Sequence, residues 1–302
     1  MSSARANRRG MAALAGAMAM FSVNDMLMKL TAQRNPLGEV ITVRGVMATL
    51  LVGAVMIAMG QLTSLRMVTN RLVLGRTALD GAAMILFTSA LIHMPLAELS
   101  AINLVSPLII TALAVIFFAE EVGWRRWAAI FIGFVGTLLI VSPTPANFNA
   151  WALLGVATAI AGASRDVITR QLPPGIPTVA ISFMAAIGTV VIGCIMCLFE
   201  DWRPMALADV GLLAIAALFL ATGHFLIVIA FRGVDVAAIA PFRYTLLIWA
   251  GALGYVVFGE IPDRYAIFGS ALIVGSGLYA LHREVVRRRT VAAAVPPIEP
   301  GA

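Results

Sequence analysis

The sequence predicts an all-α integral membrane protein, with ten transmembrane helices arranged as two inverted five-helix repeats. Its 302 residues are 61% hydrophobic and 12% charged, whereas a soluble domain has about 25% charged residues. The apolar residues form ten long runs, and a set of charged residues in the first half recurs in the second half at a nearly constant offset. These observations exclude a soluble domain and indicate a membrane protein with an internal repeat.

Each apolar run is long enough to cross the hydrocarbon core of a bilayer as a helix, which takes about 20 residues. The runs do not show the short alternation of barrel strands, and the mean hydropathy of the chain is +0.97. We therefore expect ten helical spans. They cover residues 11–31, 37–60, 72–93, 97–118, 124–141, 150–171, 177–199, 207–231, 235–258 and 264–282.

Basic residues in the connections predict the orientation, because cytoplasmic loops carry an excess of lysine and arginine. With a cytoplasmic N-terminus, fourteen arginines lie in cytoplasmic segments and three, Arg34, Arg203 and Arg264, lie in outer segments. We expect a multi-pass protein of the inner (cytoplasmic) membrane with both termini cytoplasmic. The net charge of +6 follows from this bias and does not call for nucleic acid. Residues 1–10 and 283–302 are expected to be cytoplasmic tails, the second basic and disordered.

The two halves of the chain share a pattern. An acid, a base and a proline recur at an offset of 141, in the pairs Asp25 with Asp166, Lys29 with Arg170, and Pro36 with Pro177. A glutamate and a glycine recur at an offset of 139, in the pairs Glu121 with Glu260 and Gly136 with Gly275. Each half, 11–142 and 150–282, holds five spans, and an odd number makes the two halves cross the membrane in opposite directions. Such inverted repeats are common in secondary transporters.

The recurring charges are candidates for gates. Asp25 and Lys29 lie one turn apart near the outer end of the first span, and Asp25 is expected to pair with Lys29 or a neighbour. Asp166 and Arg170 occupy the matched place at the cytoplasmic end of the sixth span. We expect these pairs to lie at the two mouths and to open and close during transport. Static ion pairs, or a Lys29 side chain that extends to the interface, are the alternatives.

Two arginines lie inside predicted spans, Arg44 in the second and Arg243 in the ninth. Arginine costs about 2.5–3.5 kcal/mol at the centre of a membrane helix, so both side chains are expected to be buried inside the bundle. A buried guanidinium can hold a substrate carboxylate or phosphate, or it can be a counter-ion to Glu39 or Asp80. Asn103 in the fourth span aligns with Arg243 across the repeat and is a further cavity candidate.

Other polar and aromatic side chains are candidates for proton coupling or substrate contact. Asp80 in the third span is a candidate proton carrier, or it pairs with Arg76 one turn away. His224 in the eighth span is a candidate proton relay or substrate contact, although a lone buried histidine is more often a hydrogen-bonded core residue. Tyr244 and Trp249 could stack on a planar substrate or pack within the core.

Motifs for enzyme chemistry are absent: the sequence contains no H-E-x-x-H, G-x-S-x-G or Walker pattern. Cys194 and Cys197 form a C-x-x-C inside the seventh span, without a second pair or a nearby histidine, and are interpreted as apolar filler. We therefore expect neither an enzyme nor a cofactor or metal. The expected partners are membrane lipid and a small-molecule substrate. The sequence is compatible with a homodimer but does not predict one.

Three segments resemble the EamA type of the drug/metabolite transporter superfamily, over about residues 10–283. They are FSVNDMLMKL, which is followed by a proline and the arginine of GEVITVRG, then FFAEEVGWRRWAAIFIGFVGTLLIV, and most specifically APFRYTLLIWAGALGYVVFGEIPDRYAIFGSALIVGSGLYALHRE. The resemblance implies an all-helical inverted-repeat fold with a central cavity lined by the fourth and ninth spans. The chain departs from the pattern in one respect, because no proline of the ninth span matches Pro107, and Pro241 stands there instead.

The resemblance implies a secondary active transporter that moves a small metabolite across the cytoplasmic membrane by alternating access, with proton coupling through Asp25, Asp80 or His224 as one option. Its substrate would be amino acid-like or carry an anionic group if the protein exports it. It would be a vitamin- or cofactor-like compound such as riboflavin or S-adenosylmethionine if the protein imports it. A membrane-embedded binding or scaffold protein without transport is the alternative.

Overall fold

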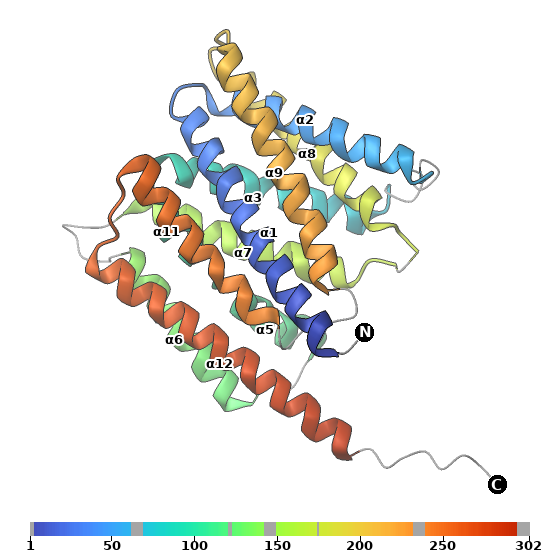
Figure 1. Ribbon diagram of the computed structural model, residues 1–302, viewed down its shortest axis with the longest axis vertical. Coiled ribbons are helices and arrows are strands. Elements are labelled where there is room, and N and C mark those ends of the chain that lie inside the picture. The colour runs from blue at the N-terminus through green and yellow to red at the C-terminus, as the bar shows by residue number, and fades with distance from the viewer. Residues whose placement is uncertain are drawn as a thin grey trace.

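The computed structural model describes residues 3–61, 69–119, 123–141, 149–173, 175–231 and 239–294. All regular elements within these ranges are helices (Figure 1). Ten helical segments of the described chain are long and apolar enough to cross a membrane, which confirms the expected number.

The spans begin and end close to the residues predicted from the apolar runs. The first five are α1 (Ser3–Ala32), α2 (Leu37–Ala58), α3 (Arg71–His93), the pair α4 (Leu96–Asn103) and α5 (Ser106–Phe118), and α6 (Trp124–Val141). The second five are α7 (Ala150–Arg170), α8 (Thr178–Cys197), α9 (Leu207–Phe231), the pair η2 (Ala240–Tyr244) and α11 (Thr245–Phe258), and α12 (Arg264–Ala294).

Local sequence explains where several spans start. The side chains of Asn70 and Asn149 accept hydrogen bonds from the backbone N–H two residues further on, at 2.9 and 3.1 Å, and so cap α3 and α7. Pro36 and Pro177 stand directly before α2 and α8. A proline has no N–H to leave unpaired there, and its backbone angle suits a helix start. The repeated proline therefore marks the same helix boundary in both halves.

The fourth and ninth spans are both broken at matched positions. The fourth breaks between Asn103, the last residue of α4, and the start of α5. The ninth changes from a 3-10 helix to an α-helix after Tyr244, which is offset by about 140 residues from that break. Pro107 and Pro241 each stand in the first turn of a helical segment, where a proline is tolerated. The prolines differ between the halves, yet the interruption is shared.

The most extensive helix contacts join one half of the chain to the other. α1 packs on α9, α3 on α7, α2 on α8, and α6 on α12 (Figure 1). α1 and α9 are the first and eighth spans, and α3 and α7 are the third and sixth. Because the repeat matches the first span with the sixth and the third with the eighth, these two contacts are equivalent. The other two contacts join matched spans directly. This pattern is the one expected of two inverted repeats around a pseudo-two-fold axis.

α6 and α12 approach each other closely because of two glycines. A Cβ on Gly136 would lie 2.6 Å from the carbonyl oxygen of Gly269, and a Cβ on Gly269 would lie 2.5 Å from that of Gly136. Small residues let membrane helices pack backbone to backbone. Gly275, the repeat partner of Gly136, faces open space instead. The repeat thus predicts a glycine but not the contact that it makes.

The largest cluster of buried apolar side chains lies where α1, α3, α4 and α7 meet. It contains Met28, Leu91, Leu96, Leu99, Ile102 and Ala159, among others. Fully buried positions of α4 form much of this cluster. The core therefore holds the short first half of the broken fourth span in place.

Both ends of the chain are more helical than the sequence suggested. α1 begins at Ser3, and α12 continues to Ala294, so residues 283–294 form a helix instead of a disordered tail. The first turn of α1 and the last turn of α12 lie on the same side of the molecule, at the lower right of Figure 1. Residues 295–302 and Glu121 lie outside the described part of the chain.

Candidate substrate and gating site

Lys29 is buried near the end of α1, and its partner is Glu260 and not Asp25. The ammonium donates hydrogen bonds to a carboxylate oxygen of Glu260 and to the carbonyl of Met94. The second carboxylate oxygen of Glu260 accepts a hydrogen bond from the backbone N–H of Leu96, the first residue of α4, at 2.7 Å. The side chain of Lys29 therefore does not extend to the interface, because a carboxylate that follows α11 reaches it inside the molecule.

The same end of the molecule carries further contacts between the halves. We call it the α1–α2 end, and its described connections are residues 33–36, 94–95, 198–206 and 259–263. Three hydrogen bonds join the start of α2 and the residues before it to the segment from Glu200 to Asp209: Asn35 with Asp209 at 3.0 Å, Gly38 with Glu200 at 2.8 Å, and Glu39 with the backbone of Arg203. The Glu39 carboxylate is thus engaged at this end, and Arg44 has its partners elsewhere.

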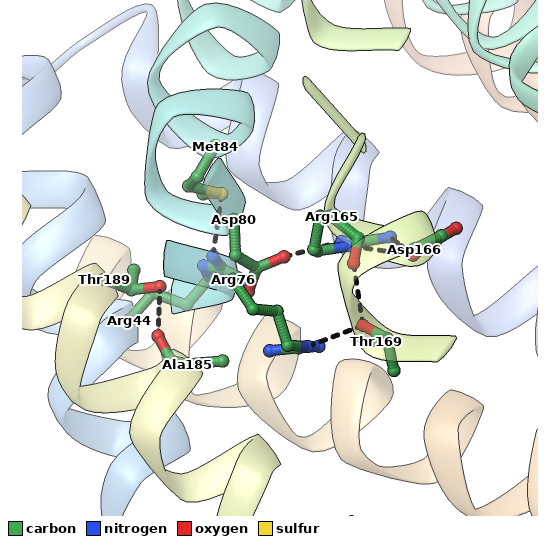
Figure 2. Close-up of polar contacts among 9 residues, drawn as sticks. All are labelled: Arg44, Arg76, Asp80, Met84, Arg165, Asp166, Thr169, Ala185 and Thr189. Carbon is green, nitrogen blue, oxygen red and sulfur yellow. Dashed lines mark hydrogen bonds and ion pairs between the residues drawn. The ribbon is translucent and has the colours of Figure 1, made fainter. Parts of the chain in front are cut away.

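Asp80 is bound by an arginine of another span. Arg165 on α7 donates from Nη1 to Asp80 at 2.6 Å and from Nε to Asp166 at 2.9 Å (Figure 2). Arg76 lies on the same helix as Asp80 but donates from Nε to the hydroxyl of Thr169 at 3.1 Å. The expected pair between Asp80 and Arg76 is therefore replaced by a pair that links α3 to α7.

The repeated acid has an equivalent neighbour in each half. Asn24 donates to Asp25 at 2.9 Å, and Arg165 donates to Asp166 at the same distance. The offset of 141 aligns Asn24 with Arg165, so the two contacts are related by the repeat. The side chain of Arg170 lies outside the described part of the structure, so its expected pairing with Asp166 stays a prediction.

Arg44 is buried, with 5% of its surface exposed, but it has only weak hydrogen-bond partners. Nη1 lies 3.5 Å from the amide oxygen of Asn24, Nη2 lies 3.2 Å from the thioether sulfur of Met84, and Nε has no hydrogen-bond partner among the described residues. Asp25 and Asp80 interact with the guanidinium through space. Neither forms an ion pair with it among those found in the described chain.

These side chains form one group, which we call the central charged cluster. Three carboxylates from α1, α3 and α7 and three guanidinium groups from α2, α3 and α7 balance one another, and Figure 2 shows five of the six. The members are Asp25, Asp80, Asp166, Arg44, Arg76 and Arg165. The cluster unites Asp25, Asp80, Asp166 and Arg44 of the residues singled out from sequence, whereas Lys29 belongs to the contact at the α1–α2 end.

His224 lies on α9 beside the cluster. Its Nδ1 is 2.8 Å from the carbonyl oxygen of Leu220, and its ring meets Phe21 of α1 edge to face, with 5.2 Å between the centroids. The ring also interacts electrostatically with Asp80, Arg165 and Arg44. The histidine is therefore an exposed residue that is hydrogen-bonded to its own helix and interacts with the cluster only through space.

The remaining candidates lie on the broken spans. Arg243 is exposed, contrary to the expected burial, whereas its neighbours Phe242 and Tyr244 in η2 are half-buried. Trp249 is 41% exposed, and Tyr244 packs against Gly277 of α12. Asn103 donates to the carbonyl of Leu99 at 3.3 Å. No hydrogen bond within the described chain joins these four side chains to the central charged cluster.

Sequence reasoning missed Arg165, Asn24 and the role of Glu260 as the partner of Lys29. The signal for the first two was available, because the repeat places Asn24 and Arg165 directly before the matched aspartates. Glu260 was found as a repeated glutamate, but nothing in the chain order indicated that it meets Lys29. The partner of a buried charge is thus harder to predict than the charge itself.

The family model of the EamA-like transporter family matches residues 8–142 and 149–281. The S-adenosylmethionine uptake transporter of Rickettsia bellii is 30% identical over 198 residues, which covers 66% of this chain and 68% of that protein. The pseudopaline exporter CntI of Pseudomonas aeruginosa is 27% identical over 84% of this chain and 89% of its own length. The riboflavin transporter of Rhizobium johnstonii is 28% identical over 72% of each chain.

A solved crystal structure of a protein shares the fold at 18% sequence identity. It superposes with a TM-score of 0.61 and covers 92% of this chain and 98% of that one. The two matches to the family model fall one on each half of the chain, in agreement with two repeats of five spans. The chain therefore belongs to the EamA-like transporter family of the drug/metabolite transporter superfamily, and it is a multi-pass membrane transporter and not an enzyme.

Proposed function

We propose that the protein is a secondary active transporter that moves a small polar metabolite across the cytoplasmic membrane by alternating access. The packing of one repeat against the other supports this proposal, because the most extensive helix contacts all cross between the halves. Two inverted halves that exchange conformations turn an opening on one side of the membrane into an opening on the other. The central charged cluster lies on the helices that would move.

The α1–α2 end is the gate that the observed contacts hold shut. Lys29 links α1 to Glu260, and Glu260 in turn binds the first N–H of α4. A buried ion pair is costly to break, since removal of one partner leaves an unpaired charge and costs about 3–5 kcal/mol. These contacts support a state that is sealed at this end. With both termini cytoplasmic, as we propose, the sealed mouth is the outer one.

The relatives support a small metabolite as the substrate, although they differ in compound and in direction. Their names specify uptake of S-adenosylmethionine, export of pseudopaline and transport of riboflavin. The buried Arg44 supports a substrate with an anionic group. Asp25, Asp80 and His224 are the groups through which a proton could be coupled to transport, since they share the neighbourhood of Arg44.

Flux into proteoliposomes tests the proposal. Purified protein is reconstituted and offered labelled S-adenosylmethionine, riboflavin and the L-amino acids, with and without an imposed pH gradient, and protein-free vesicles serve as the control. We expect at least one solute to move faster than through protein-free vesicles. An imposed proton gradient should drive its accumulation if transport is proton-coupled. If no solute moves in either direction while the reconstituted protein stays folded, a binding or scaffold role replaces transport.

A further inference from the structure

The guanidinium of Arg44 is buried and lacks an anionic partner at hydrogen-bond distance in the described chain. A guanidinium offers five N–H donors in a planar fork that matches a carboxylate. In this structure the fork meets only an amide oxygen at 3.5 Å and a thioether at 3.2 Å, and Nε is buried without a hydrogen-bond partner in the described chain. Both contacts are made to neutral acceptors, and an incoming carboxylate can replace them because arginine–carboxylate pairs are short, strong and frequently bidentate.

The side-chain amide of Asn24 lies between Asp25 and Arg44. Asn24 bridges them, since its Nδ2 donates to Asp25 at 2.9 Å and its Oδ1 faces Nη1 of Arg44. The Asn24 contact is the one hydrogen bond found for the Asp25 carboxylate in the described chain, so acceptor positions on Asp25 stay free. A positive group on a ligand held by Arg44 would meet this carboxylate.

The other charges near this place already have partners. Asp80 is bound by Arg165, and Lys29 is bound by Glu260. Arg44 and Asp25 are therefore a base and an acid of the membrane interior that are close together, opposite in charge and not joined by an ion pair in the described chain.

We propose that Arg44, Asn24 and Asp25 form a subsite for the head group of an α-amino acid, with the carboxylate on Arg44 and the ammonium on Asp25. This inference rests on the transport function proposed above and names its substrate class. The charges of the central charged cluster balance, three against three. A zwitterionic head adds no net charge there, whereas a simple anion or cation would bring an uncompensated charge into a site of low dielectric constant.

Ligand-induced thermal stabilisation of the purified full chain tests the subsite. The probes are S-adenosylmethionine and the L-amino acids. For the probe that binds best, two derivatives follow: one with the carboxylate removed or converted to an amide, and one with the amine acetylated. We expect each derivative to bind about 10- to 100-fold more weakly, because a hydrogen bond to a charged group contributes about 1.5–3 kcal/mol.

Two variants separate recognition from a structural role. Arg44→Gln should weaken binding of the parent probe by the same factor while leaving the carboxylate-free derivative unaffected. Asp25→Asn should weaken binding of the parent probe while leaving the N-acetylated derivative unaffected. Each variant thus loses the preference for one charged group of the ligand. Arg264→Gln, an exposed arginine at the start of α12, is the control and should bind like the wild type. If Arg44→Gln does not fold, Arg44→Lys keeps the charge and should retain part of the carboxylate preference.

Three outcomes would overturn the subsite: no α-amino acid compound binds, both derivatives bind as well as the parent probe, or each variant weakens all ligands equally. Flux in the same preparation distinguishes this failure from failure of the transport proposal. If riboflavin or another solute without an amino acid head is carried while the α-amino acid probes are ignored, transport stands and the subsite does not exist. If nothing is carried, the transport proposal itself fails.

Discussion

At the scale of single residues, the buried charges are partnered mostly across spans. Lys29 on α1 meets Glu260 beyond α11, and Asp80 on α3 meets Arg165 on α7. An unpaired charge is costly inside a membrane, so these pairs select which helices can lie together. Arg44 is different, because it is buried among weak acceptors and no ion pair in the described chain engages it. The need to pair buried charges explains these two ion pairs, but it does not explain why Arg44 is buried without one.

The Lys29–Glu260 contact makes the first prediction. Glu260→Gln should favour the state that is open at the α1–α2 end. The test uses a cysteine placed at Ser22, which is buried where α1 contacts α11. Its labelling should accelerate about tenfold or more, since a shift of about 1.4 kcal/mol in the equilibrium between the two states changes the open population by a factor of about ten. The measurement is the rate of maleimide labelling in a background with Cys194→Ala and Cys197→Ala.

Arg34→Gln is the matched control for this gate, because Arg34 lies at the same end but its side chain is 60% exposed and its ion pair with Asp209 is long, at 3.8 Å. Exposed pairs of this kind contribute little to stability. The labelling rate should therefore match that of the parent. An unchanged rate in folded Glu260→Gln protein would show that the contact is structural.

The pair between Asp80 and Arg165 makes the second prediction. Asp80→Asn and Arg165→Gln should each destabilise the protein by about 1–3 kcal/mol, because the first leaves Arg165 with Asp166 alone and the second leaves Asp80 without its partner. The double variant should be more stable than the sum of the single effects implies. Thermal unfolding in detergent measures the coupling. Strictly additive losses would mean that the 2.6 Å contact contributes no interaction energy of its own.

At the scale of elements, two features shape the helix bundle. The fourth and ninth spans are each broken, so that each begins with a short helical segment, α4 or η2. In addition, α6 and α12 pack closely at the edge of the molecule (Figure 1). The close packing depends on Gly136 and Gly269, where the backbones leave no room for a side chain. The breaks occur at matched positions although the prolines do not match. The break is therefore a property of the repeat and not of one proline.

A glycine pair makes the prediction at this scale. Gly136→Ala should destabilise the protein by about 1–3 kcal/mol, because the new methyl group would press on the backbone of α12. Gly275→Ala is the matched control, since it faces open space in the same helix pair, and it should be neutral or gain up to about 1 kcal/mol from helix propensity. Thermal unfolding of both variants is the measurement. Equal effects would contradict the close approach.

At the scale of the whole molecule, the architecture is that of two halves that hold each other through matched helices. Several contacts of the α1–α2 end run between segments of different halves, as in Asn35 with Asp209 and Gly38 with Glu200. A change of state that opens this end must break them together. Coordinated opening is thus a consequence of where the repeats meet, and not of one residue.

The orientation makes the last prediction. Because the basic residues lie almost entirely in alternate connections, both termini should be cytoplasmic and the connection 198–206 should be outside. Green fluorescent protein fused at residue 302 should fluoresce. Alkaline phosphatase should be active when fused after Asp201 and inactive at residue 302. The opposite pattern would invert the assignment of the sealed mouth to the outer side.

Much of this architecture is predictable from sequence. The apolar runs predicted the ten spans to within a few residues for most of them, because a span must be long and apolar whatever its neighbours are. The repeat also indicated Asp25 and Asp166 as equivalent positions. It did not reveal that Arg243 is exposed, since residues 235–258 were predicted as one helical span, whereas Ala240–Tyr244 form a 3-10 helix.

The number, order and opposed direction of the spans follow from the chain alone, since apolar length and internal repetition are properties of the sequence. The stretch FSVNDMLMKL shows where that information stops. It contains Asp25 and Lys29 side by side on one helix, yet Lys29 bonds to a carboxylate 231 residues away, and Asp80 bonds to an arginine 85 residues away. Which charges meet depends on how the two halves pack, because partners so distant in the chain become neighbours only in the folded protein.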